Sequence, residues 1–108
     1  MNKIELDFEK MNGLIPAVVQ DSETGEILML AFQNKEAYEK TLESNEVYFF
    51  SRSRNELWKK GATSGNVLKV VEVITDCDED SALIKVEHDK NLKACHTGER
   101  SCFFKKIL

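Results

Sequence analysis

The strongest constraint on the fold is a pair of β-branched runs in the second half of the chain. Residues 66–76, NVLKVVEVITD, are rich in Val and Ile, which are enriched in β-strands. Residues 81–88, SALIKVEH, follow after a short acidic segment. The two runs predict a long strand and its antiparallel partner.

Further strands are predicted on both sides of this pair. GLIPAVVQ contains the only proline, Pro16, and indicates an edge strand, since proline lacks an N–H for a central ladder. It forms a predicted hairpin with ILMLAF at 27–32 through the turn DSETGE at 21–26. EVYFFS at 46–51 and LWKKG predict two more strands, and SCFFKKIL predicts a last one.

One segment predicts a helix. Asn34 can cap a helix through KEAYEKTLES, giving a main helix at about 34–44. Ala37, Tyr38 and Leu42 are spaced to share its buried face. The predicted fold class is therefore α+β, with a mainly antiparallel β-sheet or partial barrel and one main helix.

Composition excludes several classes of protein. The chain has 108 residues, enough for one domain, and a formal net charge of −4, so no basic face for nucleic acid is expected. The N-terminus MNKIELDFEK lacks the apolar core of a signal peptide, and no apolar run is long enough to span a membrane. A cytoplasmic protein that binds neither nucleic acid nor membrane is expected.

The three cysteines, Cys77, Cys95 and Cys102, indicate metal ligation. Their odd number without an export signal argues against a disulfide framework. Each has polar or ionisable neighbours, in DCD, ACHTG and RSCF, whereas buried cysteines usually stand in apolar runs. Zinc prefers thiolate ligands, and a bound cation lowers a cysteine's pKa.

The acidic segment TDCDEDS offers two kinds of ligand. If it is extended, Asp76, Asp78 and Asp80 point to one face and Cys77 and Glu79 to the other. Carboxylate oxygens suit Mg²⁺ or Ca²⁺, and sulfur suits zinc. The segment could then serve two metals, although a solvated acidic turn is the simpler alternative.

The second cysteine cluster is ACHTGERSC, where Gly98 lets the chain bend back between Cys95 and Cys102. His96 as a fourth ligand would give a closed Cys₃His site, typical of a small binding module with structural zinc. Three thiolates with an open position would instead form a catalytic site, leaving His96 for proton transfer. A thiol redox protein is disfavoured because no C-x-x-C is present.

Positive charge gathers in SRSRNELWKKGATSG at 51–65. Guanidinium groups bind phosphate in a bidentate manner, and nearby hydroxyls and amides add donors. The predicted anion site comprises Arg52, Arg54, Lys59, Thr63, Ser64 and Gly65. Trp58 by itself is interpreted as a core residue.

Three ordered motifs, SRSRNELWKKGATSG, DCDED and ACHTGERSCF, together with LIPAVVQDSETGEILMLAFQNKEA, closely resemble the phosphoribosyl-AMP cyclohydrolase family of histidine biosynthesis. The resemblance covers roughly residues 8–104. It implies a zinc-dependent hydrolase, a cyclic amidine hydrolase, that opens the N1–C6 bond of the adenine ring of N1-(5-phosphoribosyl)-AMP. Zinc-activated hydroxide would attack C6, as in zinc adenine deaminases. The product is a bis-phosphoribosyl imidazole carboxamide.

The resemblance also implies ligands and assembly. Cys77, Cys95 and Cys102 match the zinc ligands, and His96 matches a histidine that assists proton transfer. The family also needs Mg²⁺, whose ligands match Asp76, Asp78 and Asp80. Its members are intertwined homodimers whose zinc sites, one per subunit, draw cysteines from both chains.

The chain departs from the family pattern before the second cysteine cluster. Lys93 replaces the proline that the family usually carries just before ACHTG, so the resemblance predicts no conformation for the loop at 88–94. A single cyclohydrolase domain over 1–108, with no fused pyrophosphohydrolase domain, is expected.

Overall fold

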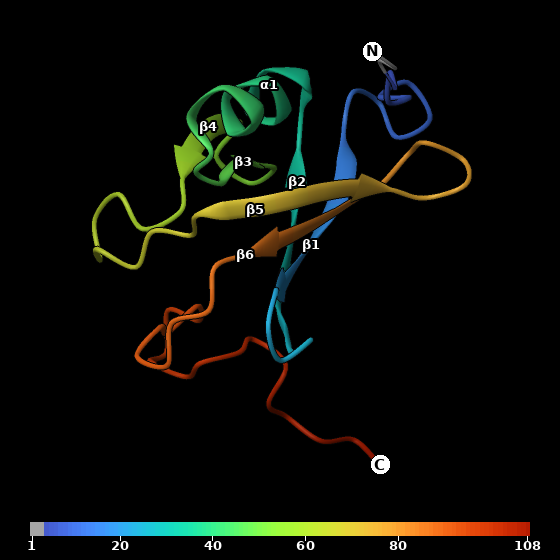
Figure 1. Ribbon diagram of the computed structural model, residues 1–108. Coiled ribbons are helices and arrows are strands. Elements are labelled where there is room, and N and C mark those ends of the chain that lie inside the picture. The colour runs from blue at the N-terminus through green and yellow to red at the C-terminus, as the bar shows by residue number, and fades with distance from the viewer. Residues whose placement is uncertain (1–3) are drawn as a thin grey trace.

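The computed structural model describes residues 4–108, which form two β-sheets and one α-helix (Figure 1). The elements, in chain order, are β1 (Ile15–Asp21), β2 (Ile27–Gln33), α1 (Lys35–Ser44), β3 (Tyr48–Ser51), β4 (Glu56–Lys59), β5 (Val70–Thr75) and β6 (Ala82–Val86). This confirms the predicted α+β class. The helix of the described region is too short and too polar to cross a membrane.

The larger sheet is mixed. Its strand order is β2-β1-β6-β5, and the pairs β1–β2 and β5–β6 are antiparallel, as predicted. The central pair β1–β6 is parallel, with Ala17 opposite Ala82 and Asp21 opposite Val86. Strands β3 and β4 form a separate antiparallel pair. The two sheets of the described region do not close, so the partial-barrel prediction is corrected to two open sheets.

Strand β1 is central, and its prediction as an edge strand was wrong. Its side chains alternate strictly between buried and half-buried positions, with Ile15, Ala17 and Val19 in the core. Pro16 is tolerated because pairing with β6 begins only at Ala17. The missing N–H of Pro16 therefore interrupts no bond to β6.

Helix α1 begins where the sequence predicts. Asn34 has extended backbone angles, and its side-chain oxygen accepts a hydrogen bond of 2.8 Å from the N–H of Ala37. At the other end Asn45 adopts φ 59° and donates its N–H to the Thr41 carbonyl. Both ends thus satisfy backbone groups that a helix leaves unpaired.

The buried face of α1 differs from the prediction. Ala37 is buried and Tyr38 half-buried, but Leu42 is 48% exposed, and Thr41 is buried in its place. The Thr41 hydroxyl donates to the Ala37 carbonyl at 2.8 Å and accepts from the Gln33 side chain at 3.0 Å. A satisfied hydroxyl can therefore face the core, which turns Leu42 outward.

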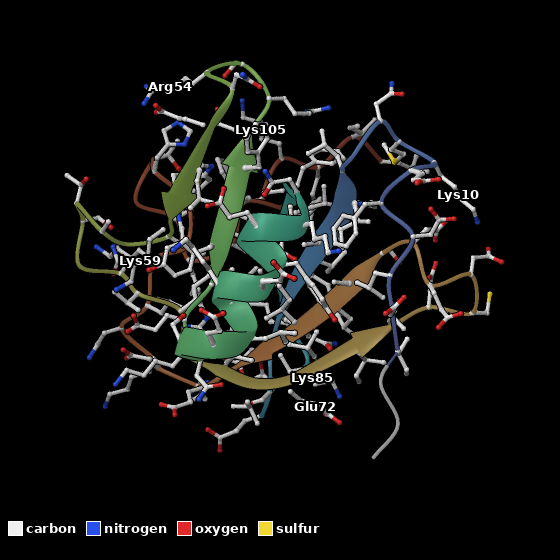
Figure 2. The ribbon with its side chains drawn as sticks, turned by 90° about the horizontal axis from the view of Figure 1, so that it is seen from above. Lys10, Arg54, Lys59, Glu72, Lys85 and Lys105 are labelled. Carbon is white, nitrogen blue, oxygen red and sulfur yellow. The ribbon has the colours of Figure 1, made fainter. Side chains whose placement is uncertain are left out.

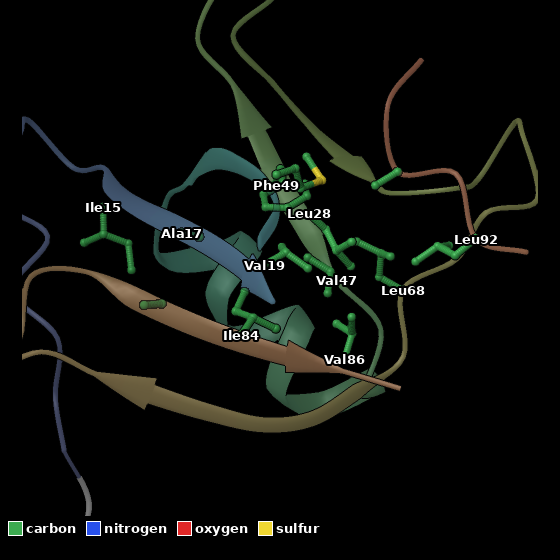
Figure 3. Close-up of a cluster of buried hydrophobic side chains, with 13 residues drawn as sticks. Ile15, Ala17, Val19, Leu28, Val47, Phe49, Leu68, Ile84, Val86 and Leu92 are labelled. Atoms are coloured by element: carbon green, nitrogen blue, oxygen red, sulfur yellow. The ribbon is translucent and has the colours of Figure 1, made fainter. Parts of the chain in front are cut away.

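The hydrophobic core lies between β1, β2, β6 and the β3–β4 pair (Figure 3). Phe49 is fully buried, and the ring of Trp58 packs against it at 5.2 Å between centroids. Trp58 is half-buried and packs against the core, so its interpretation as a core residue is confirmed in part.

Two strand predictions extended too far. The run 66–76 forms a strand only over Val70–Thr75, since Leu68 turns into the core and its carbonyl accepts the N–H of Val47. SCFFKKIL forms no strand. Cys102 donates one backbone hydrogen bond to Leu28, but Phe103 and the residues after it are exposed.

Candidate metal and substrate site

The acidic segment forms the loop between β5 and β6. Asp76, Asp78 and Asp80 each place a carboxylate oxygen within 4.8 Å of the others. The three carboxylates therefore lie together, as predicted, and their role as metal ligands stays a prediction. Carboxylate oxygens that converge in this way are the donors that Mg²⁺ or Ca²⁺ takes.

The reason for this convergence is a turn, which corrects the prediction of an extended segment. The N–H of Glu79 donates to the Asp76 carbonyl at 3.1 Å, and Glu79 has φ 58°. The N–H of Asp80 donates to the Asp76 carboxylate at 3.0 Å. Cys77 lies exposed within this turn and does not occupy the opposite face of a strand.

Local hydrogen bonds favour the ionised form of Asp76. The pKa of Asp76 is lowered, because the N–H of Asp80 donates to its carboxylate and outweighs the effect of desolvation. The ammonium group of Lys10 lies 3.3 Å from Asp80, and this contact raises the pKa of Lys10. The donor set therefore fits a hard cation, with Lys10 as a neighbouring positive charge.

The cysteine loop is a tight hairpin-like turn after β6. The N–H of Ala94 donates to the Arg100 carbonyl at 2.9 Å, and that of Cys95 donates to the Glu99 carbonyl at 3.1 Å. Gly98 closes the turn at φ 95°, a backbone conformation that favours glycine. The chain thus bends back between Cys95 and Cys102, as expected from Gly98, and the two thiols lie close together.

The two thiols of this loop differ in environment. Thr97 donates its hydroxyl to the sulfur of Cys95 at 3.0 Å, and this bond is the main reason why the pKa of Cys95 is lowered. Burial raises the pKa of Cys102, and the adjacent Cys95 adds to that effect. Two adjacent cysteines can together bind a thiophilic cation such as zinc, and metal binding releases the protons of both thiols.

Lys60 is a functional candidate that sequence reasoning missed. Its ammonium group donates to the Ala94 carbonyl, and its charge adds to the lowering of the pKa of Cys95 and partly opposes the rise caused by burial at Cys102. Lys59 instead pairs with Glu46 at 2.6 Å. Consecutive residues at the end of β4 face opposite ways, so strand alternation could have predicted that Lys59 and Lys60 have different partners.

Cys77 does not join the other two cysteines within one chain. It precedes β6, whereas Cys95 and Cys102 follow it, and Figure 1 shows the two loops at different ends of the sheet. A strand of this length spans about 16 Å, too far for a shared ligand shell. Among residues 4–108, only the three aspartates form a cluster of three or more metal donors.

The histidines occupy different positions. His96 is exposed next to Cys95, where a side chain can reach solvent and a bound molecule. The Nδ1 atom of His88 lies 2.8 Å from the Asp21 carboxylate, just beyond β6. His88 is therefore part of a polar contact outside the cysteine loop.

The basic residues of the predicted anion site are close in sequence but have different surroundings in the structure. Arg52 lies 4.0 Å above the Phe32 ring, beside a hollow of about 590 Å³ that Phe50 and Trp58 also line. Arg54 is exposed in the β3–β4 turn, and Figure 2 shows Arg54 and Lys59 on the side of the molecule away from Lys10. Lys59 is engaged by Glu46, while the two arginines remain accessible.

The remaining predicted anion ligands lie in the loop after β4. Thr63, Ser64 and Gly65 are exposed, and Ser64 accepts the N–H of Asn66 at 3.2 Å. Gly65 donates its N–H to the Gly61 carbonyl at 2.9 Å, which closes the loop. The loop is connected to the cysteine loop through Lys60.

Comparison with known proteins gives a consistent result. A family model described as phosphoribosyl-AMP cyclohydrolase matches residues 29–104. A relative of that name from Desulfatibacillum aliphaticivorans is 62% identical over 104 residues, 96% of this chain and 82% of the relative. One from Streptococcus mutans serotype c is 55% identical over 107 residues, 99% of this chain and 96% of the relative. One from Clostridium botulinum is 56% identical and covers 96% and 93%.

Proposed function

The chain belongs to the phosphoribosyl-AMP cyclohydrolase family, which places it as an enzyme in histidine biosynthesis, and we propose that it works as a zinc-dependent homodimer. Its reaction is the hydrolytic opening of the N1–C6 bond of the adenine ring in N1-(5-phosphoribosyl)-AMP. The zinc ligands are Cys77, Cys95 and Cys102. Family membership favours this enzyme over a binding module with structural zinc.

The observation that carries the proposal is the division of the cysteines between two loops. Cys95 and Cys102 are in contact, and the lowered pKa of Cys95 prepares it as a thiolate ligand. Cys77 is exposed at the other end of β6. A three-thiolate site therefore needs Cys77 from a second copy of the chain, which makes the site a property of the dimer.

Each group has a defined task in this proposal. Zinc bound by three thiolates supplies a water whose pKa is lowered to near neutrality. His96, adjacent to Cys95 and exposed, would transfer a proton to the ring nitrogen N1 that is released when the N1–C6 bond breaks. Lys60 balances part of the thiolate charge and holds the loop through Ala94.

The phosphates of the substrate require cations in an acidic protein. Mg²⁺ held by Asp76, Asp78 and Asp80 can neutralise one of them. Arg52 and Arg54 are the accessible cations of the predicted anion site. Lys59, Thr63, Ser64 and Gly65 complete the proposed set; the Lys59–Glu46 ion pair must open before Lys59 can bind phosphate.

An ultraviolet time course with phosphoribosyl-AMP tests the proposal. Protein stripped of metal is compared with protein given zinc, then zinc with Mg²⁺, because ring opening changes the purine absorbance. We expect a spectral change only when zinc is present. A full rate in metal-free protein would exclude the zinc mechanism.

The variant His96→Ala separates catalysis from structural ligation. We expect it to remain folded and to bind zinc as the wild type does, but to react about 10²-fold to 10⁴-fold more slowly. Loss of zinc and of the fold in this variant would instead favour a Cys₃His site. Circular dichroism and zinc analysis make the distinction.

A further inference from the structure

A buried carboxylate, Asp21, stands at the end of β1, and no role in the site was predicted for it from the sequence. Asp21 is 1% exposed, and both of its oxygens are occupied. One accepts the backbone N–H groups of Glu23 and Thr24 at 2.8 and 2.9 Å. The other lies 2.8 Å from His88 and accepts a hydrogen bond from Arg100 at 2.7 Å. Asp21 is therefore a fully satisfied buried charge.

Arg100 connects three segments through one guanidinium group. Besides Asp21, it donates to the Glu26 carboxylate at 2.7 Å and to the Asp89 carbonyl at 2.7 Å. These partners belong to the end of β1, the β1–β2 turn and the segment after β6. Because the guanidinium is planar and rigid, its three contacts fix the position of Arg100 itself.

Arg100 is also hydrogen-bonded to the backbone of the cysteine loop. Its carbonyl accepts the N–H of Ala94, the residue before Cys95. Ser101, the next residue, donates its hydroxyl to the Ile27 carbonyl at 2.7 Å, and Cys102 follows it. Residues 88–104 form no strand or helix, so such contacts replace a hydrogen-bonded ladder there.

We infer that Asp21 and Arg100 are a positioning pair, which sets the separation of the Cys95 and Cys102 thiols before metal binds. The inference rests on the proposed function, in which both thiols are metal ligands. Neither Asp21 nor Arg100 touches the metal; each acts through the backbone of the loop. Groups outside the ligand shell that orient ligands in this way typically change metal affinity by 10-fold to 100-fold when they are replaced.

Stability by itself is a weak explanation for this pair. A buried ion pair often contributes little more than hydrophobic residues of the same size, because both charges must be desolvated. The contacts of this pair instead fix the conformation of a loop that has no helix or strand. Exposed loops otherwise sample many conformations, and a preset ligand separation avoids that entropy cost on binding.

Cobalt titration of the full-length dimer tests the inference, because thiolate-bound Co²⁺ has characteristic visible and near-ultraviolet absorption. We expect Asp21→Asn and Arg100→Lys to bind Co²⁺ at least about 10-fold more weakly than wild type, with altered bands. Glu72→Gln is the matched control, since it removes a partner of Lys85 in a surface ion pair of 4.0 Å. Figure 2 shows that pair on the outside of the molecule.

A second measurement is independent of the proposed function. In a Cys77→Ser background only Cys95 and Cys102 remain, and their binding of phenylarsine oxide, which requires two adjacent thiols, reports their separation. We expect Asp21→Asn to slow this binding about 10-fold. If wild type binds no Co²⁺ through thiolates while this difference persists, the proposed function fails and the positioning pair stands.

Three outcomes would overturn the inference. Folded Asp21→Asn and Arg100→Lys proteins with wild-type Co²⁺ affinity and spectra would show that the pair does not position the ligands. Unchanged arsenical binding would show that it does not set the thiol separation. Unfolding of both variants would make the pair a requirement of the fold alone.

Discussion

Gly61 has no room for a side chain. A Cβ atom added there would lie 2.4 Å from the backbone of Asn66 and Val67, and its φ of 86° disfavours L-residues. Gly65, in the same loop, has φ 83° but nothing within 4 Å of an added Cβ. Replacing Gly61 would therefore cause both a steric clash and backbone strain, whereas replacing Gly65 would cause backbone strain alone.

We expect Gly61→Ala to lower the free energy of unfolding by about 2–4 kcal/mol, through strain and a backbone clash. Gly65→Ala is the control and should cost about 1 kcal/mol, from strain alone. Urea unfolding measures both values. Equal losses would mean that the loop moves to accommodate the clash at Gly61.

Asp21 predicts a specific pH dependence of stability. Burial would raise its pKa, but hydrogen bonds from Thr24, His88 and Glu23 outweigh burial and hold the pKa well below its usual range. Because the folded pKa is depressed, the stabilisation is present above the unfolded pKa of about 4 and is lost as pH falls below it.

We expect wild type to lose on the order of 2 kcal/mol more than Asp21→Asn between pH 5 and the acid limit of folding. Urea unfolding curves at several pH values give both slopes, and carboxylates that share no partner with Asp21 contribute equally to each protein. Parallel slopes would mean that Asp21 is not the ionised partner that its contacts indicate.

Helix α1 depends on a cap that the sequence reveals. Replacing Asn34 by Ala removes the acceptor for the Ala37 N–H, and we expect a loss of about 1 kcal/mol. Asn34→Ser keeps a capping oxygen and should stay within a few tenths of a kcal/mol of wild type. Thermal unfolding compares the two. A full loss in the serine variant would point to some other role of Asn34.

Elements fixed by neighbouring residues could be predicted, whereas those fixed by distant ones could not. The β1–β2 hairpin and the Asn34 cap are encoded locally, and both were predicted correctly. The parallel pairing of Ala17 with Ala82 follows from no local pattern, so β1 was taken for an edge strand. Residues 101–108 have β propensity, but they form no strand because they lack a neighbouring strand in the described part of the chain to pair with. Tertiary context therefore overrides propensity in this segment.

The same distinction applies to the candidate site. Asp76, Asp78 and Asp80 could be grouped from sequence because they share one short loop, although a turn gathers them and not an extended strand. Lys60 and Arg100 act through contacts with remote segments, and the sequence contains no signal for those contacts. The grouping of the aspartates could thus be predicted from one short segment, whereas contacts between remote segments could not.

For the molecule as a whole, the separation of the cysteine loops predicts complementation. Cys77→Ser and Cys95→Ser should each be inactive. Mixed after dissociation in equal amounts, they should recover about a quarter of wild-type activity, since half of the dimers are mixed and each holds one intact site. Activity and zinc content after mixing are measured together.

A mixture of Cys95→Ser and Cys102→Ser is the matched control. Both changes fall in one loop, so no mixed dimer contains an intact site, and no activity should return. Recovery in the control, or none in the first mixture, would contradict sites shared between chains.

The central position of β6 in the sheet also predicts the order in which parts of the chain fold. Both ligand loops flank this strand, and its parallel partner β1 lies far away in the chain, so the contact forms only after a large loop closes. The β1–β2 hairpin and α1 can form earlier from local contacts. Metal-dependent protection of the cysteine thiols should therefore appear only in the slowest phase of refolding, so that an incompletely folded chain has no assembled site with which to capture zinc.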